Sequence, residues 1–188
     1  MPESLEWSLF SEERLAEVQQ FKCGSDYAWQ TAIATWIKSP ADQKFSALYA
    51  IEKKGTRVWL YHNQAGQLVG YGSLGTTNWT WPYPNGARKA VSIIPSLGIQ
   101  LEFQGEPKTG PKEDKFSRQI MRHLISESVQ QGLDYLVLKV HEDNGRAIDL
   151  YVKKFRFRPF RVKEDRYIRM RRRVIPKAPP NLSTALTL

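Results

Sequence analysis

Apolar residues recur with helical spacing in the N-terminal third of the chain. The pattern begins after Asp26, a residue suited to cap a helix, and it ends at Ser39-Pro40. Five apolar residues share one face of this helix: Trp29, Ala32, Ile33, Trp36 and Ile37. We interpret that face as packing rather than as a ligand site. Residues 45–53 fit a strand and a helix equally well.

A β-hairpin is predicted next. Residues 57–62 and 67–74 are rich in β-branched and aromatic side chains, and residues 63–66 (Asn-Gln-Ala-Gly) form a turn signal between them. Tryptophans, prolines and Asn-Gly then predict an irregular loop over residues 75–90. Its tryptophans either fold back on the core or form an acceptor pocket or a partner surface.

Strands and helices alternate in the second half of the chain. Pro95 lies inside the apolar run 91–99 and cannot donate to a β-ladder, so we expect a strand that is broken or bulged there. Residues 104–114 are turn-rich and predict a loop. A helix is expected over residues 114–131, ended by Gly132.

The C-terminal part continues with a near-continuous apolar segment, residues 134–140, which is typical of a central strand. Asp143 or Asn144 then caps another helix, and residues 157–173 predict two strands joined at residues 163–165. This order of elements indicates the α/β class, as one α+β domain with a central twisted mixed sheet flanked by helices on both faces.

Length and composition predict the number of domains and the cellular compartment. A chain of 188 residues suits one domain, for which we expect residues 1–174, followed by a C-terminal tail, residues 175–188. No apolar run approaches the roughly 18 residues of a membrane helix, so we expect no membrane partner. The single cysteine, Cys23, fits a reducing cytoplasm, and three histidines without metal-ligand spacing predict no metal site.

Positive charge gathers near the C-terminus. Residues 153–177 hold twelve Lys and Arg against Glu164 and Asp165, which accounts for the whole net charge of +9. Such a segment attracts nucleic acid or a polyphosphate ligand, or it keeps a pair of edge strands solvated. The sequence leaves both interpretations open.

Two segments in this order resemble the GNAT (GCN5-related) N-acetyltransferase superfamily. Residues 97–105 (LGIQLEFQG) resemble the end of its fourth strand, and the spacing Asn144, Ala147, Tyr151 and Phe155 resembles its N-x-x-A-x-x-x-Y segment. The likeness covers about residues 57–160. It implies the GNAT acyl-CoA N-acyltransferase fold and transfer of an acetyl group from acetyl-CoA, the co-substrate, to a primary amine. The other interpretation is a CoA-binding or interaction module of this fold without turnover.

The resemblance also implies a cofactor-binding set. Strand backbone would bind the pantetheine arm, and main-chain N–H groups at a loop and a helix start would bind the pyrophosphate. The implied residues are Leu97, Gly98, Ile99, Gln104, Gly105, Ser117, Arg118 and Asn144. A small residue at position 98 would let the thioester approach the backbone. The loop after Gly105 is longer than in the family, and Lys115 and Ser117 replace its later glycines.

Catalysis needs an acid for the leaving thiolate and a base for the amine. The family position of Tyr151 implies the general acid, whereas its spacing alone is that of a core aromatic. Glu102, at the expected end of a strand, is our candidate base, with His141 and Glu142 as alternatives and a water relay as another route.

A narrower resemblance concerns the toxin-type branch of the GNAT enzymes. Phe21-Lys22-Cys23-Gly24, followed by Trp36-Ile37, resembles the entry motif of that branch, as do residues 69–74. Its members acetylate aminoacyl-tRNA and are neutralised by a DNA-binding antitoxin. The acceptor is therefore left open between a small molecule or protein amine and tRNA, and the assembly between a monomer and a homodimer.

Overall fold

The computed structural model describes residues 4–80, 88–106, 115–164 and 166–174. Eight strands form its core: β1 (Glu6–Leu9), β2 (Arg57–His62), β3 (Leu68–Thr80), β4 (Arg88–Ile94), β5 (Leu97–Ile99), β6 (Tyr135–His141), β7 (Arg158–Glu164) and β8 (Tyr167–Arg173). The helices are α1 (Leu15–Val18), α2 (Ala28–Lys38), α3 (Ala47–Lys54), α4 (Phe116–Gln130) and α5 (Gly145–Asp149). A π-helical segment, Leu150–Lys154, continues α5, and two 3₁₀ turns span Glu12–Arg14 and Leu101–Phe103.

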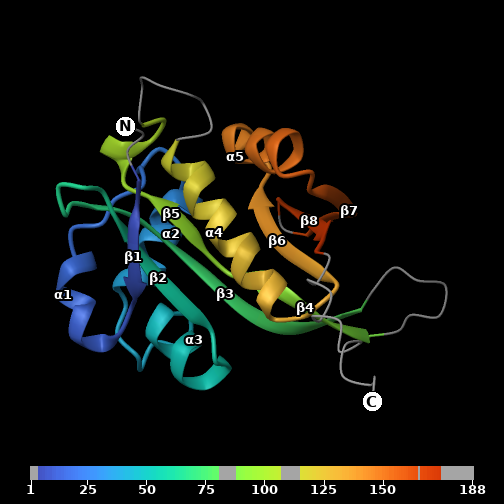
Figure 1. Ribbon diagram of the computed structural model, residues 1–188, viewed down its shortest axis with the longest axis horizontal. Helices are drawn as coiled ribbons and strands as arrows, with labels where there is room; N and C mark the ends of the chain where they lie inside the picture. The colour runs from blue at the N-terminus through green and yellow to red at the C-terminus, as the bar shows by residue number, and fades with distance from the viewer. Residues whose placement is uncertain (1–3, 81–87, 107–114, 165, 175–188) are drawn as a thin grey trace, which may run out of the picture.

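One twisted sheet contains all eight strands. Its order is β1-β2-β3-β4-β6-β8-β7, and β5 pairs with β3 (Figure 1). The pairing of β4 with β6 is parallel, whereas every other pair described is antiparallel. The mixed sheet predicted from the sequence is therefore confirmed.

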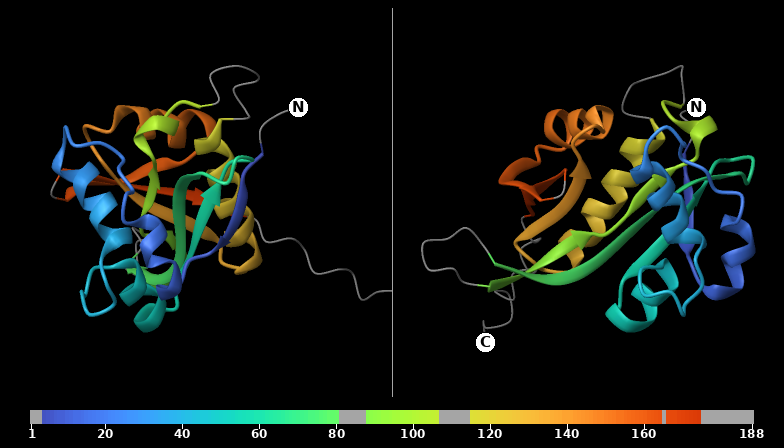
Figure 2. Two further views of the ribbon diagram at one scale, coloured as in Figure 1. Left: turned by 90° about the vertical axis from the view of Figure 1, so that its left-hand side faces the viewer. Right: turned by 180° about the vertical axis from the view of Figure 1, so that it is seen from behind.

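Helices cover both faces of the sheet, as Figure 2 shows. The alternation of β2 illustrates why: Val58 and Leu60 pack with α2 and α3, whereas Trp59 and Tyr61 pack against α4 on the other face. Burying one such side chain stabilises the fold by roughly 1.5–3 kcal/mol. The two apolar faces of the sheet thus place α1, α2 and α3 on one side and α4 and α5 on the other.

Most predicted elements are confirmed, and the ambiguous segment 45–53 is helical. Ser46 Oγ caps α3 by accepting the Tyr49 N–H at 3.0 Å, and Gly55 ends the helix with a φ of +60°. Those two signals outweigh the β-branched and aromatic content of the segment. The N-cap of α2 is Tyr27 rather than Asp26, and the Tyr27 N–H donates to Gln30 Oε1 at 3.0 Å.

The loop predicted over residues 75–90 is wrong in extent. Strand β3 continues to Thr80 and β4 begins at Arg88, with a continuous register from Gly75 opposite Ile93 to Thr80 opposite Arg88. β-branched threonines at positions 76 and 77 favour this long hairpin over the loop that the later prolines suggested. Residues 81–87 lie outside the described part of the chain.

The C-terminal strands were predicted, and strand β1 was missed. The short β1 lies exposed at the sheet edge, and the alternation in its sequence, Glu-Trp-Ser-Leu, is only four residues long. Val174 is buried after β8, and its N–H donates to Asp134 O at 2.8 Å. The predicted tail, residues 175–188, lies outside the described residues, and the boundary at 174 stays a prediction. Within the described residues, the structure has no helix of the length and apolarity that a membrane crossing requires.

Candidate active site

The site originates where two parallel strands separate. Strands β4 and β6 pair from Ser92 opposite Leu136 to Ile94 opposite Leu138. Pro95 then interrupts the chain, and β5 pairs with β3 through Gly72 opposite Leu97 and Gly70 opposite Ile99. Beyond Leu138, β6 continues to His141 without a partner on this side among the described strands. The sheet therefore opens between β5 and the end of β6, as the broken strand predicted.

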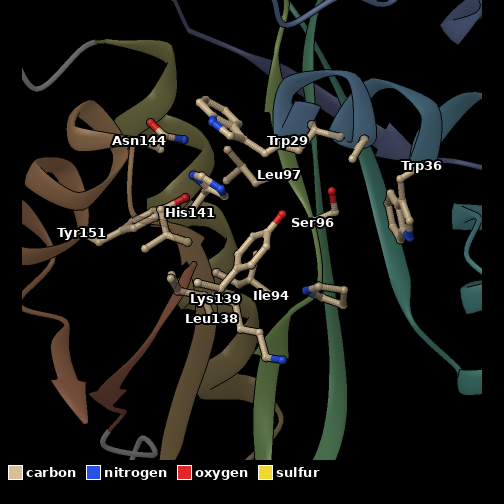
Figure 3. A pocket seen from close by; sticks show the side chains of 15 residues that line it. Trp29, Trp36, Ile94, Ser96, Leu97, Leu138, Lys139, His141, Asn144 and Tyr151 are labelled. Atoms are coloured by element: carbon tan, nitrogen blue, oxygen red, sulfur yellow. The ribbon is translucent and has the colours of Figure 1, made fainter. Parts of the chain in front are cut away.

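A cavity of about 490 Å³ occupies this opening. Helix α2 lines it from one face of the sheet, and residues at and after the start of α5 line it from the other. Figure 3 shows Asn144, His141 and Tyr151 gathered on one side of the cavity and Trp36 on the other. A ligand in this position would contact both faces of the sheet.

Tyr151 lies in the cavity wall on the π-helical segment. It is 8% exposed, and burial raises the pKa of its hydroxyl to about 12. The hydroxyl is therefore protonated at neutral pH and is a hydrogen-bond donor. The same desolvation raises the pKa of a thiolate formed beside it, which favours proton transfer to sulfur.

Asn144 has a structural role and still faces the cavity. Its Oδ1 accepts the Ala147 N–H at 3.2 Å and caps α5. The side-chain amide group of Asn144 forms no hydrogen bond with the part of the chain that the structure describes. The two roles weighed from the sequence, helix cap and ligand donor, are thus compatible because they use different atoms.

Strand β5 supplies the opposite wall. Leu97 lines the cavity, whereas Ile99 packs against the main core. A Cβ on Gly98 would lie 2.8 Å from Tyr71 Cε1 and 2.9 Å from Ile33 Cγ2. The glycine is therefore required by packing under α2, a reason that differs from the thioester approach inferred from the sequence.

The expected phosphate site lies at the other end of β5. Gln104 donates its side-chain amide to Cys23 O at 2.8 Å and to Ile99 O at 3.3 Å, so this side chain ties the loop to the core. Gly105 has a φ of +88°, and its carbonyl accepts the Lys115 ammonium. A Cβ on Gly105 would lie 3.8 Å from Arg146 Nη2, which brings a second cation to this point.

The first turn of α4 is partly satisfied by protein. The Phe116 N–H donates to Glu106 O at 2.9 Å, and the Arg118 N–H donates to Lys115 O at 2.8 Å. Arg118 is buried and Ser117 is half-buried. The enlarged loop predicted here falls on residues 107–114, outside the described residues. Among the described residues, Lys115 and Arg146 are the cations best placed at Gly105, and Arg146 was missed because it lies in a different element.

The three candidate bases occupy different environments. Glu102 is exposed on the 3₁₀ turn Leu101–Phe103 rather than at a strand end, and it does not line the cavity. Glu142 is held by Arg166, with 3.1 Å between Oε1 and Nε. His141 lines the cavity, and its Nδ1 accepts the Asp143 N–H at 3.3 Å. Only His141 is brought together with Tyr151.

Sequence reasoning missed the aromatic wall. The His141 ring lies between Trp29, at 6.2 Å between centroids, and Tyr167, at 5.2 Å. Trp29 and Trp36 both line the cavity, so the apolar face of α2 is not packing alone. Two tryptophans seven residues apart were the available signal.

One polar atom in this wall is unsatisfied. The Trp29 Nε1 is buried without a hydrogen-bond partner among the described residues. An unsatisfied buried donor costs about 1–3 kcal/mol, although a ligand in the cavity would reach this atom only if the indole ring turned. Among the same residues, no three His, Cys, Asp or Glu side chains are grouped as a metal site would need.

No family profile matches the sequence, and no curated protein matches it in sequence. Solved structures do match. A tyrosine-to-phenylalanine mutant of the toxin AtaT, bound to the C-terminus of the antitoxin AtaR and acetyl-CoA, superposes with a TM-score of 0.60 at 13% identity. That match covers 90% of this chain and 93% of the other.

Two further structures give the same picture. A GNAT-family acetyltransferase from Staphylococcus aureus Mu50 has a TM-score of 0.58 at 15% identity, covering 91% of this chain and 99% of the other. The spermidine/spermine N-acetyltransferase SpeG from Vibrio cholerae has a TM-score of 0.57 at 17% identity, covering 90% and 92%. The chain therefore has the GNAT fold, with structural similarity to acetyltransferases that include a toxin.

Proposed function

We propose that the protein transfers an acetyl group from acetyl-CoA to a primary amine. The observation that carries this proposal is the protonated hydroxyl of Tyr151 in a cavity at the opening between β5 and β6. The GNAT fold supports it, since AtaT structures of that fold hold acetyl-CoA. The backbone edges of β5 and β6 that face the opening supply the donors and acceptors that a pantetheine arm needs.

The binding mode follows from the two ends of β5. Lys115 and Arg146 would pair with the pyrophosphate near Gly105, and the pantetheine arm would run along Leu97 toward Tyr151. Asn144 would donate its side-chain amide to a pantetheine carbonyl. Charge at the phosphate end then comes from side chains in place of the family's glycine-rich backbone.

The chemistry needs one bond made and one broken. The neutral amine attacks the thioester carbonyl carbon, the new C–N bond forms, and the C–S bond breaks. Tyr151 donates its proton to the departing sulfur, and His141 accepts the proton that the amine loses. Asp143 Oδ2 lies 3.7 Å from His141 Nδ1, so it would stabilise the protonated ring.

Replacing His141 by glutamine is expected to lower kcat/KM for the amine by about 10²-fold, because a positioned base contributes about that much. Acetyl-CoA affinity should change little. Glu102→Gln is the matched control, since its exposed carboxylate does not line the cavity and its rate should stay near wild type. Steady-state kinetics decide between them: loss of activity in Glu102→Gln with a normal His141→Gln enzyme would reverse the assignment.

Calorimetry with acetyl-CoA, followed by an acceptor screen, tests the proposal as a whole. We expect binding in the micromolar range and CoA release that depends on an added amine. Binding without release against any amine would instead support a binding module of the GNAT fold. Absence of acetyl-CoA binding would exclude both the acetyltransferase and the CoA-binding module.

A second candidate acceptor is aminoacyl-tRNA. It is favoured by cationic residues that lie opposite each other across strands: Arg158 lies opposite Arg171, and Lys139 of β6 lies opposite Arg169. Phosphate groups of a polyanion bind to such a basic surface. Charged tRNA therefore belongs in the acceptor screen, where strong salt dependence of transfer would identify it.

A further inference from the structure

A second cavity, of about 230 Å³, adjoins the first. Trp36 and Pro95 line both cavities, so the two cavities are neighbours on either side of these residues. The other walls of the second come from the segment before α3, from α3 itself and from β3. A smaller space beside α3 thus lies next to the opening between the strands.

The second cavity carries positive charge and hydroxyl groups. Lys44 and Lys54 line it together with three threonines, at positions 56, 76 and 77. Neither lysine forms an ion pair in the part of the chain that the structure describes, and Lys54 Nζ lies 5.9 Å from the centre of the Tyr49 ring. These groups are donors suited to an anion.

Neither cavity is lined by an aspartate or a glutamate. Beside the first cavity, the nearest acidic residues in the sequence are Glu142 and Asp143, and both are held by Arg166, at 3.1 Å and 2.7 Å. Beside the second they are Asp42 and Glu52, which do not line it, and Glu52 pairs with Lys53. A second ammonium group on the acceptor would therefore meet no carboxylate in either cavity, and in the smaller one it would meet two lysines. Coulombic repulsion disfavours a polyamine in this position.

The second cavity is also remote from the expected phosphate site. Along the chain, Ile93 and Pro95 precede β5, whereas Gly105 follows it, so the two features lie on opposite sides of the opening. Figure 1 shows α3 and the N-terminal end of α4 toward opposite ends of the molecule. The phosphates of acetyl-CoA would thus occupy one end and leave the other end for the acceptor.

We propose that the acceptor is a primary amine with an anionic group at its far end, and that Lys44 and Lys54 bind this anion while the amine reaches the first cavity. This inference rests on the proposed acetyl transfer. Ser96 lines the first cavity and Ile93 the second, and three residues of strand separate them by roughly 10 Å. A chain of about six carbons between amine and anion matches that span.

Four amines of equal chain length test the proposal with the full-length protein: hexylamine, diaminohexane, aminohexanoate and aminohexyl phosphate. We expect kcat/KM for the two anionic amines to exceed that for hexylamine by about tenfold, and diaminohexane to fall below hexylamine. The ratio between the carboxylate and the phosphate then identifies which anion the lysines prefer.

Reversing the charge of the two lysines tests whether they bind the anionic group of the acceptor. In the double variant Lys44→Glu/Lys54→Glu, KM for aminohexanoate should rise by about tenfold, and the ratio of kcat/KM for aminohexanoate to that for hexylamine should fall by about the same factor. Lys53→Glu is the matched control, because Lys53 precedes Lys54 on α3, pairs with Glu52 and does not line the cavity. Its kinetics should equal those of the wild type.

The outcomes separate this inference from the acetyl transfer itself. Turnover of hexylamine that equals or exceeds turnover of the anionic amines, or a preference for diaminohexane, would overturn the anionic acceptor and leave acetyl transfer standing. An unchanged KM for aminohexanoate in the double charge-reversal variant would also overturn the anionic acceptor and leave acetyl transfer standing. Failure of acetyl-CoA to bind would overturn both the anionic acceptor and the proposed acetyl transfer.

Discussion

Replacing Tyr151 by phenylalanine is expected to lower kcat by about 10²–10⁴-fold while leaving the affinity for acetyl-CoA nearly unchanged. The size follows from the general-acid role, because a positioned proton donor contributes a factor in this range. The aromatic ring, which is buried beside Phe157 at 5.8 Å between centroids, is kept by the substitution. Single-turnover and steady-state assays of CoA release measure the effect.

Stability separates this role from a structural one. The Tyr151 hydroxyl forms no hydrogen bond with the described residues, so the variant should unfold within about 1 kcal/mol of the wild type. Tyr61→Phe is the reciprocal control: its hydroxyl is bonded to His123 Nδ1 at 2.7 Å, away from the cavity. That variant should lose about 1–2 kcal/mol of stability and keep its rate. Equal rates in wild type and Tyr151→Phe would contradict the acid assignment.

The pH profile gives an independent check on Tyr151. Because burial raises its pKa to about 12, the hydroxyl stays protonated up to at least pH 10. The wild-type rate should therefore rise with pH as the amine loses its proton, with no decline on the alkaline side below about pH 10. A decline near neutral pH would mean that the essential acid is another group.

The sequence predicted the opening of the sheet from one residue. Pro95 cannot donate to a ladder, and the structure ends the pairing of β4 with β6 immediately before it. The motif position of Tyr151 likewise led to a residue that lines the cavity. Both signals are local: a missing donor in one case and a motif within one helix in the other. The broken strand is confirmed, whereas the catalytic role of Tyr151 stays a prediction.

Other features depend on contacts between distant segments and could not be predicted. Helical spacing showed that one face of α2 is apolar. It did not show that Ile37 on this face is buried in the core, whereas Trp29 lines the cavity. Glu102 was expected at a strand end, yet the chain turns after Ile99 because the Leu101 N–H bonds to Lys22 O at 2.7 Å. The second cavity combines Lys44 and Lys54 with β3 residues that no motif links to them.

Gly70→Ala is expected to destabilise the protein by about 3 kcal/mol, which lowers the melting temperature by roughly 6–12 °C. A Cβ at this position would lie 2.4 Å from Gly98 O and 3.2 Å from Ile99 Cα. Both atoms belong to the backbone of β5, which cannot rotate away as a side chain does. The strand must therefore move away from β3.

Such a movement connects stability to the site, because β5 forms one wall of the opening and pairs with β3 through Gly70 opposite Ile99. Acetyl-CoA affinity should fall together with stability in Gly70→Ala, measured by calorimetry and by denaturant unfolding. Gly145→Ala is the matched control: no heavy atom lies within 4 Å of its Cβ position, at the start of α5. That alanine should leave stability unchanged or raise it by about 0.4–1 kcal/mol. A Gly70→Ala protein as stable as the wild type would show that β5 does not lie against β3 at this point.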